Sequence, residues 1–285
     1  MGRIGVIGGS GLYNIEGIKN IKTVSVATPF GRPSGKFVLG ILEGKEVAFL
    51  PRHDVGHRIA PSHINYRANI FAMKKLGVER VISVTACGSL KEELKPLDFV
   101  CVDQFVDRTN YARDMSFFTK GIVAHIEFAR PVCEELRGLM YKAGEDLNLR
   151  IHNGGTYINM EGPAFSTLAE SNLYRSWGMD VIGMTNLAEA KLAREAGICY
   201  ATLAAVTDYD CWRGREESVT IDMVIQNLKK NVENSKRILF AVIRDLKPQR
   251  DCACKDALKY AIVTDRKLIS RKIRKDLDII IGKYL

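Results

Sequence analysis

The 285-residue sequence contains no run of 18 apolar residues, so none of its segments is predicted to cross a membrane as a helix. It also lacks the long apolar core of a signal peptide, because glycines interrupt the segment that follows Met1. We therefore expect a cytoplasmic protein with no membrane partner. With 46% apolar residues, the chain can bury a sizeable core within a single domain.

The common nucleotide-binding loops are absent as well. Gly8-Gly9-Ser10-Gly11 follows a short apolar segment, but Asn14 stands where the pattern G-x-G-x-x-G requires glycine. Gly35-Lys36 is followed by Phe37, so it does not complete a P-loop. Backbone N–H groups of a glycine turn can still bind one phosphate, with a serine hydroxyl as a further donor. The alternative is a tight turn without a ligand.

Metal-binding patterns are weak. His53 and His57 have H-x-x-x-H spacing, but the sequence offers no third ligand and no helical pattern to carry the pair. Among seven cysteines, Cys252-Ala253-Cys254 has no second cysteine or histidine pair near it in the sequence, which argues against a zinc ribbon. We therefore predict no metal site.

The cysteines leave two alternatives for their redox state. A disulfide between Cys252 and Cys254 would close a small, strained ring and form a redox-active pair. Free surface thiols are the ordinary state in a cytosol. In a thermophilic source a further pair, Cys133 with Cys199, could also be oxidised. Both alternatives stand at this point.

The net charge of +9 is concentrated most densely in residues 266–275. Apolar residues recur through and beyond this stretch at steps of three and four, namely at Ile269, Ile273, Leu277, Ile280 and Tyr284. This spacing predicts a helix with one buried stripe and a basic face in water. The pattern favours a solvated surface over nucleic-acid binding, and the positive charge also suits a small anionic substrate.

Segments typical of strands and helices alternate along the chain. Strands are predicted at 3–7, 36–42, 46–50, 81–84, 98–104, 155–160, 181–183 and 201–206, and helices at 65–76, 131–147, 168–177, 188–196 and 220–243. This alternation predicts an α/β fold with a central mixed, largely parallel sheet flanked by helices. We expect one domain over residues 1–285, with a C-terminal helical extension from about residue 252 to 285.

The apolar run Ala201–Val206 ends abruptly in Thr207-Asp208-Tyr209-Asp210. In open α/β sheets, ligands bind at the carboxyl ends of the strands. If the strand continues, Asp208 and Asp210 project to the same side, because side chains in a strand repeat every two residues. Two neighbouring carboxyl groups do not both ionise readily, so one of them can stay protonated and act as an acid. The alternative is a solvated turn.

Two other predicted strands deliver polar residues in the same way. Arg52-His53 follows the strand at 46–50 and provides a guanidinium suited to phosphate, although an ordinary polar loop is the alternative. Thr85-Ala86-Cys87-Gly88-Ser89 follows the strand at 81–84. Cys87 has the chemistry of a nucleophile, but no neighbouring residue in the sequence would lower its pKa, which favours a small buried side chain.

Six motifs together resemble the trimeric purine nucleoside phosphorylase superfamily, and within it the methylthioadenosine phosphorylases. They occur in the family's order: Gly8-Gly9-Ser10-Gly11, Thr28-Pro29-Phe30-Gly31, Arg52-His53, Thr85-Ala86-Cys87-Gly88-Ser89, Asn159-Met160-Glu161-Gly162-Pro163 and Thr207-Asp208-Tyr209-Asp210-Cys211-Trp212. The resemblance covers roughly residues 3–245. It implies a nucleoside phosphorylase fold and phosphorolysis of 5′-methylthioadenosine to adenine and 5-methylthioribose 1-phosphate, without cofactor or metal.

The resemblance also assigns residues to roles. It implies a phosphate site made of Ser10, Arg52, His53, Thr85, Ala86 and Thr185. It implies a nucleoside site made of Phe165 against the base, Met184 against the ribose, the catalytic acids Asp208 and Asp210 at the purine, and Ile221, Val224, Ile225 and a neighbouring subunit's His125 around the methylthio group. The active sites would then lie at the subunit interfaces of a homotrimer or a hexamer.

Alternatives and departures accompany this resemblance. A purine nucleoside phosphorylase acting on inosine or guanosine would need a donor to the 6-oxo group, whereas Asp208 and Asp210 offer acceptors that suit a 6-amino group. A non-enzymatic nucleotide-binding protein would show a broken phosphate site, which the sequence does not. The family often carries threonine at the position of Ser10 and arginine at the position of Ala164.

Overall fold

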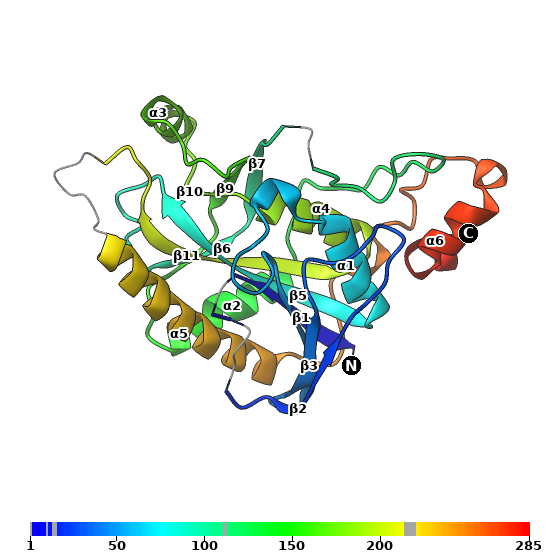
Figure 1. Cartoon of the computed structure of the whole chain (residues 1–285), viewed down its shortest axis with the longest axis horizontal. Helices are drawn as coiled ribbons and strands as arrows, with labels where there is room; N and C mark the ends of the chain where they lie inside the picture. Colours follow the sequence, from blue (N-terminus) through cyan, green and yellow to red (C-terminus); the bar gives the residue numbers. More distant parts are fainter. Residues whose placement is uncertain (1, 10, 13–15, 111–112, 214–220) are drawn as a thin grey trace.

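The structure is a computed structural model that describes residues 2–9, 11–12, 16–110, 113–213 and 221–285, with the backbone alone for 221–225. In the part of the chain that it describes, one mixed sheet forms the centre of the molecule (Figure 1). Its strands are β1 (Arg3–Gly8), β2 (Lys19–Val24), β3 (Phe37–Leu42), β4 (Lys45–Pro51), β5 (Val78–Ser89), β6 (Phe99–Val102), β7 (Gln104–Arg108), β8 (Ile151–Asn153), β9 (Thr156–Met160), β10 (Val181–Gly183) and β11 (Cys199–Tyr209).

The sheet branches at β5. Along one edge of β5, β1 pairs in parallel up to the register Ile7↔Ser83, and β10 pairs antiparallel with Gly88 and Ser89. In the part of the chain that the structure describes, residues 84–87 of β5 therefore have no strand partner on that edge. The other edge of β5 pairs in parallel with β11 along almost its whole length.

Helices cover both faces of this sheet, as the alternation predicted. The longer ones are α1 (Tyr66–Lys75), α2 (Glu134–Asp146), α3 (Leu168–Ser176), α4 (Asn186–Glu195), α5 (Ile221–Asp245) and α6 (Arg271–Ile281). Helices α2 and α5 pack on one face and α1 and α4 on the other, so that two apolar clusters sandwich the sheet (Figure 1). The apolar run of β11 is buried throughout because it lies between these layers.

Local signals in the sequence explain several element boundaries. A hairpin forms between β3 and β4, where Leu42 pairs with Lys45 and the two turn residues have positive φ of 50° at Glu43 and 72° at Gly44. Helix α1 begins after Asn65, whose side chain accepts a hydrogen bond from the Ala68 N–H. The chain leaves α1 at Gly77, which has a φ of +74° that favours glycine.

One predicted strand differs from the structure, and two strands were not predicted. The strand expected at 98–104 is divided into β6 and β7, because the Asp103 side chain between them accepts a hydrogen bond from the Gly155 N–H. Strand β2 was not predicted because it is a mostly exposed edge strand whose residues are largely polar. Strand β8 was missed because it is only three residues long.

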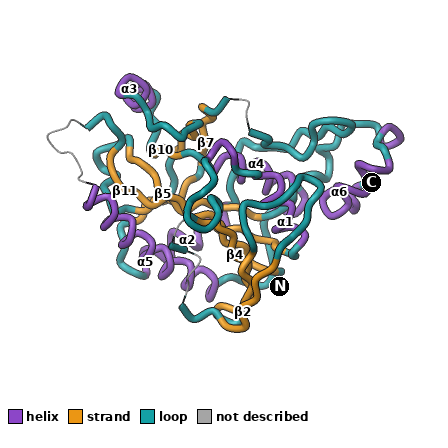
Figure 2. The backbone as a smooth tube through the Cα atoms, in the orientation of Figure 1, coloured by secondary structure: helices purple, strands orange, loops and turns teal. Residues whose placement is uncertain are grey.

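The C-terminal segment folds as expected into a helix with a buried stripe. It contains α6 together with the short 3-10 helices η3 (Ala253–Asp256), η4 (Arg266–Leu268) and η5 (Gly282–Tyr284). Leu277 and Ile280 of α6 are buried in the same apolar cluster as residues of α1 and α4. Long loops lead to this end of the molecule (Figure 2). Among the described residues, none of the helices is long and apolar enough to cross a membrane.

Candidate active site

The predicted phosphate residues converge where the sheet branches. Strands β1 and β10 end at Gly8 and Gly183, opposite the unpaired edge of β5 at residues 84–87. Ala86 lies in this stretch and is exposed, although β5 is the central strand. A change of strand direction at the carboxyl ends of strands is where open α/β sheets bind ligands.

Arg52 reaches this place from the end of β4 and is 1% exposed. Its backbone N–H donates to the carbonyl of Gly8, which fixes it beside the end of β1. Its Nε lies 2.5 Å from Glu189 Oε1 and its Nη2 3.2 Å from Oε2, so the two side chains form a bidentate ion pair. Burial is the largest single effect and lowers the pKa of Arg52, but the charge of Glu189, its hydrogen bond to the guanidinium and smaller effects of nearby tyrosines together raise that pKa above its ordinary value.

Further hydrogen bonds hold the guanidinium of Arg52. Nη2 donates to Ser83 Oγ at 2.5 Å and Nη1 to the Val84 carbonyl at 3.2 Å. A guanidinium has five N–H donors, so these bonds leave at most one for a phosphate. Glu189 was not predicted as a site residue, and its only signal in the sequence is an acid within the apolar pattern of α4.

His53 is also buried beside the ends of β1 and β4. Its Nδ1 lies 2.8 Å from the carbonyl oxygen of Ile59. Because a carbonyl only accepts, Nδ1 carries the proton and the Nε2 of the neutral ring is left as an acceptor. Burial, reinforced by the charge of Arg52, lowers the pKa of His53 to about 4, so the ring is neutral at neutral pH. Its ring stacks on that of His57, with centroids 4.1 Å apart.

Two threonines complete the predicted phosphate residues that the structure describes. Thr85 is buried in β5, and its hydroxyl donates to the carbonyl of Ala86 at 3.1 Å. Thr185 is the N-cap residue of α4. It therefore lies at the helix end that carries a partial positive charge. The next residue, Asn186, is fully buried, and its amide lies 3.0 Å from Ser83 Oγ. The amide links α4 to β5.

The two predicted acids lie at the end of β11, beside Gly88 of β5. Asp208 is the register partner of Gly88, after a bulge that displaces Thr207. The Cβ of Asp210 lies 3.6 Å from the position that a Cβ on Gly88 would take. Burial raises the pKa of Asp208; a 2.5 Å hydrogen bond from Thr207 Oγ1 lowers it in part, and the charge of Asp210 raises it further.

Asp210 is 8% exposed, and its Oδ2 has no hydrogen-bond partner among the described residues. A buried acceptor of this kind is free to bind a donor from a ligand. Two asparagines of α5 fix the backbone of β11 just before the acids. Asn227 donates to the Thr207 carbonyl at 3.1 Å, and Asn231 to the Val206 carbonyl at 2.8 Å. Neither was predicted, although their spacing of four residues places them on one face of a helix.

Met184 and Phe165 differ in how closely the surrounding protein packs against them. Met184 is half-buried, and its backbone carbonyl accepts a hydrogen bond from the buried Arg113. Arg113 also pairs with Glu161, which fixes the loop after β9. Phe165 follows that loop but is 83% exposed, so its ring is not packed against the protein. A ring in this state is available to a ligand.

Comparisons with known proteins agree with this geometry. The sequence matches the phosphorylase superfamily over residues 3–244. It is 54% identical over 282 residues to an S-methyl-5′-thioadenosine phosphorylase of Geobacter sulfurreducens, covering 99% of each chain. It is 53% identical over 281 residues to one of Koribacter versatilis, covering 99% of this chain and 96% of that protein. The chain belongs to the S-methyl-5′-thioadenosine phosphorylase family of the phosphorylase superfamily.

Solved structures support the same family. A methylthioadenosine phosphorylase from an antarctic soil metagenomic library superimposes with a TM-score of 0.91 and 46% identity, covering 97% of this chain and 98% of that one. Methylthioadenosine phosphorylase from Schistosoma mansoni in complex with adenine gives a TM-score of 0.81 at 32% identity, covering 98% of both chains. The predicted α/β fold, with its mixed central sheet flanked by helices, is therefore confirmed.

Not every residue that the family resemblance assigned can be located in this site. Ser10 and the side chains of Ile221, Val224 and Ile225 lie outside the described residues. His125 is exposed, and its backbone N–H donates to the Ala261 carbonyl of the C-terminal segment. This hydrogen bond joins the segment around His125 to the C-terminal segment. Long loops lead toward α6 (Figure 1).

The cysteines of this family member are all free thiols, so neither disulfide considered from the sequence is formed in the structure. Cys254 is buried, and the expectation of a surface thiol was wrong for it, because η3 folds against the sheet. Cys87 is also buried, and burial raises its pKa, which suits a packing residue rather than a nucleophile. His53 and His57 belong to no group of three or more metal-ligating side chains among the described residues.

Proposed function

We propose that the protein catalyses phosphorolysis of 5′-methylthioadenosine to adenine and 5-methylthioribose 1-phosphate. The observation that carries the proposal is the acid pair at the end of β11, in which Asp208 is half-buried with a raised pKa and Asp210 presents an acceptor that is unpaired among the described residues. The family relatives are named for this substrate, which supports the same assignment. Phosphate and a purine nucleoside are then the two small-molecule partners.

In the proposed reaction, a phosphate oxygen forms a bond to the anomeric carbon while the bond from that carbon to purine N9 breaks. The electron pair of the broken bond moves onto the purine. A protonated Asp208 donates its proton at N7, so adenine leaves as a neutral base. Since Asp208 is half-buried near Asp210, it keeps its proton to higher pH than an exposed aspartate does. The chemistry requires no cofactor and no metal.

The phosphate would be bound by the residues around the branch of the sheet. We assign this role to Ser10, Arg52, His53, Thr85, Ala86 and Thr185. Neutral His53 would accept a hydrogen bond from a protonated phosphate oxygen through Nε2, while the free N–H of Arg52 donates. The hydroxyls of Thr85 and Thr185, which donate to Ala86 and Asn186 in the structure, would turn to donate to the phosphate. The ion pair with Glu189 would hold the charged guanidinium of Arg52 beside the phosphate in a fixed orientation.

The nucleoside would lie between Asp210, Met184 and Phe165. Asp210 accepts from the 6-amino group of adenine, Met184 contacts the ribose, and the exposed Phe165 ring covers the base. We assign the methylthio pocket to Ile221, Val224 and Ile225. His125 of a neighbouring subunit would complete it in a trimer, because in its own chain it is exposed on an outlying loop.

The test is a comparison of three nucleosides with purified full-length protein. Adenine release from 5′-methylthioadenosine, followed by absorbance, should require phosphate and should produce 5-methylthioribose 1-phosphate in equal amount. Adenosine and inosine serve as the comparison substrates. Release without phosphate would make the protein a hydrolase, and a preference for inosine would favour the 6-oxopurine phosphorylase; either result overturns the proposal.

A further inference from the structure

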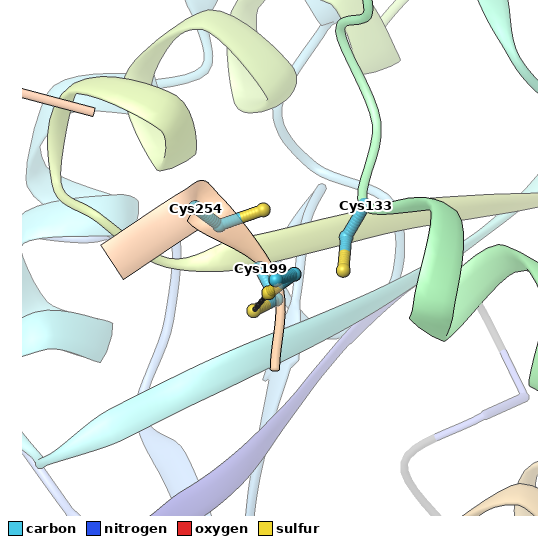
Figure 3. Close-up of side chains that lie close together, drawn as sticks. Cys133, Cys199 and Cys254 are labelled. Atoms are coloured by element: carbon cyan, nitrogen blue, oxygen red, sulfur yellow. Dashed lines mark hydrogen bonds between the residues drawn. The ribbon is translucent and has the colours of Figure 1, made fainter. Parts of the chain in front are cut away.

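Four cysteine side chains from distant parts of the sequence meet in one cluster. Cys133 immediately precedes α2, and Cys199 begins β11. Cys252 immediately precedes η3, and Cys254 lies within it. Their four sulfur atoms all lie within 4.8 Å of one another. Figure 3 shows the side chains of Cys133, Cys199 and Cys254 converging on the same small space. The second pair of ligands that the sequence around Cys252 lacks is thus supplied by the fold.

The spacing of the sulfurs suits a metal better than a disulfide. In a tetrahedral zinc site with Zn–S bonds of about 2.3 Å, neighbouring sulfurs are about 3.8 Å apart. A disulfide bond is much shorter, at about 2.05 Å. The nearest pair described, Cys199 Sγ and Cys252 Sγ, is 3.2 Å apart, and all the cysteines are free. Four sulfur ligands at this spacing are the number that a closed tetrahedral zinc site needs.

Positive groups lie next to the cluster, as a negatively charged metal–thiolate centre requires. Cys133 is the N-terminal capping residue of α2, whose partial positive charge stabilises a thiolate there. Arg80 is the register partner of Cys199 across β5 and β11, so both side chains leave the sheet on the same face. Arg80 is 2% exposed, and its Nη1 has no hydrogen-bond partner among the described residues. A buried, partly unsatisfied guanidinium points to an anionic neighbour.

We propose that Cys133, Cys199, Cys252 and Cys254 bind one zinc ion in a closed tetrahedral site. On binding, each thiol releases its proton to solvent and each sulfur donates an electron pair to the metal, so no oxidant or reductant is needed. A soft, tetrahedral set of four sulfurs selects zinc or iron over magnesium or calcium. Because four protein ligands leave no open position for substrate, the site is structural.

The position of the site agrees with a structural role. Cys199 begins β11 and Asp208 lies near its other end, about 30 Å away at the usual rise of a strand. The zinc therefore takes no part in the proposed phosphorolysis. It joins the chain after α5 to the start of β11 and to the segment before α2, and so fastens the C-terminal segment to the sheet.

The first experiment measures metal in the full chain, purified without chelator from medium containing zinc. Elemental analysis and native mass spectrometry should find one zinc per chain, and a thiol-specific mercurial should release it. The variants Cys252→Ser and Cys254→Ser should lose the zinc. Cys211→Ser is the matched control, because Cys211 is exposed and outside the cluster, and it should keep the metal.

The second experiment does not depend on how the variants fold. Wild-type protein, stripped of metal under reducing conditions and loaded with cobalt(II), should show the intense visible and near-ultraviolet bands of tetrahedral cobalt thiolate. Removing zinc should lower the melting temperature, and adding it back should restore it. Reduced protein that takes up neither zinc nor cobalt overturns the proposal. The proposal is also overturned if the cluster cysteines form disulfides. In that case the native protein is lighter by two hydrogens for each disulfide, and the cluster thiols alkylate only after reduction.

Discussion

The guanidinium of Arg52 and the carboxylate of Glu189 form a bidentate pair in which both side chains are almost fully buried. The pair joins the end of β4 to the first turn of α4, two elements far apart in the sequence. Burying such a pair costs desolvation energy, and removing one partner leaves an uncompensated charge. The pair would therefore couple the stability of the fold to the proposed binding of phosphate.

Replacing Glu189 with glutamine should consequently be destabilising. Glu189→Gln is isosteric but leaves the buried charge of Arg52 without its partner, and we expect the free energy of unfolding to fall by about 3–5 kcal/mol. Denaturant titration at a fixed protein concentration measures this change. Glu46→Gln is the control, because the Glu46 side chain is 65% exposed in its pair with Arg3, and a surface ion pair is worth about 0–1 kcal/mol. If both substitutions lower the free energy of unfolding equally, the buried pair matters no more to stability than the pair formed by Glu46.

Arg52 itself can be tested with a substitution that keeps its charge. Arg52→Lys retains the attraction to Glu189 but loses the planar fork. We expect the KM for phosphate to rise about 10- to 100-fold, the equivalent of one charge-assisted hydrogen bond, while adenine binding changes little. Arg58→Lys, in an exposed ion pair with Asp54 on the same loop, should leave both constants unaltered. Weaker adenine binding with an unchanged phosphate KM would mean that the site is misassigned.

Asp208→Asn preserves the shape of the side chain and removes its ability to donate a proton. We expect kcat/KM for 5′-methylthioadenosine to fall by about 10²-fold or more, the usual scale for losing a general acid. Asp278→Asn on the exposed side of α6 is the control for the substitution. A variant as active as the wild type would rule out Asp208 as the acid.

The same residue predicts a pH dependence. An acid acts only in its protonated form, so kcat/KM of the wild type should decline as pH rises through the pKa of Asp208. Burial raises that pKa, so the decline should begin at higher pH than for an exposed aspartate. The Asp208→Asn profile should lack this decline. If kcat/KM of the variant still declines over the same pH range, the titration of another residue causes the decline.

Asp210→Asn should change which purine is accepted. An amide can donate to a 6-oxo group, whereas the carboxylate only accepts. We expect the ratio of kcat/KM for inosine to that for adenosine to rise by about tenfold or more, because one unpaired buried group costs about 1–3 kcal/mol. The ratio is measured on one enzyme preparation, which cancels differences in the active fraction. An unaltered ratio would exclude Asp210 from recognition of the base.

Much of this site could be predicted because each strand end is a local feature of the sequence. Arg52, Thr85 and Asp208 each follow or end an apolar run, and the carboxyl ends of parallel strands meet at one edge of the sheet. The same argument predicted the α/β fold. The six ordered motifs then indicated the family, which the comparisons confirmed.

The residues that were missed act through contacts between distant segments. Glu189 lies inside a helix, where no turn or strand end marks it, and only the packing of α4 on β5 brings it to Arg52. The prediction that Cys252 has no second ligand pair considered neighbours in the sequence alone. The second pair is Cys133 and Cys199. The fold brings these two residues close to Cys252, and no periodic pattern in the sequence indicates this proximity.

A last prediction concerns the neighbouring subunit. If His125 completes the methylthio pocket of another chain, His125→Ala should raise the KM for 5′-methylthioadenosine several-fold, about the value of one lost contact, and leave phosphate binding unchanged. The stronger test mixes chains. After subunit exchange, Asp208→Asn chains and His125→Ala chains should form some complete sites, since one supplies His125 and the other Asp208. Activity of the mixture should then exceed the average of the two parents.

The control mixture combines Asp208→Asn with the double variant Asp208→Asn/His125→Ala, in which every chain lacks the acid and no complete site can form. Light scattering should show the trimer, or a hexamer of two trimers, in each preparation, and capture through a tag on one variant should confirm exchange. If chains exchange and activity does not rise, His125 acts within its own subunit or not at all. A monomer that is fully active at high dilution would contradict shared sites altogether, because no neighbour would then be present to supply the ring.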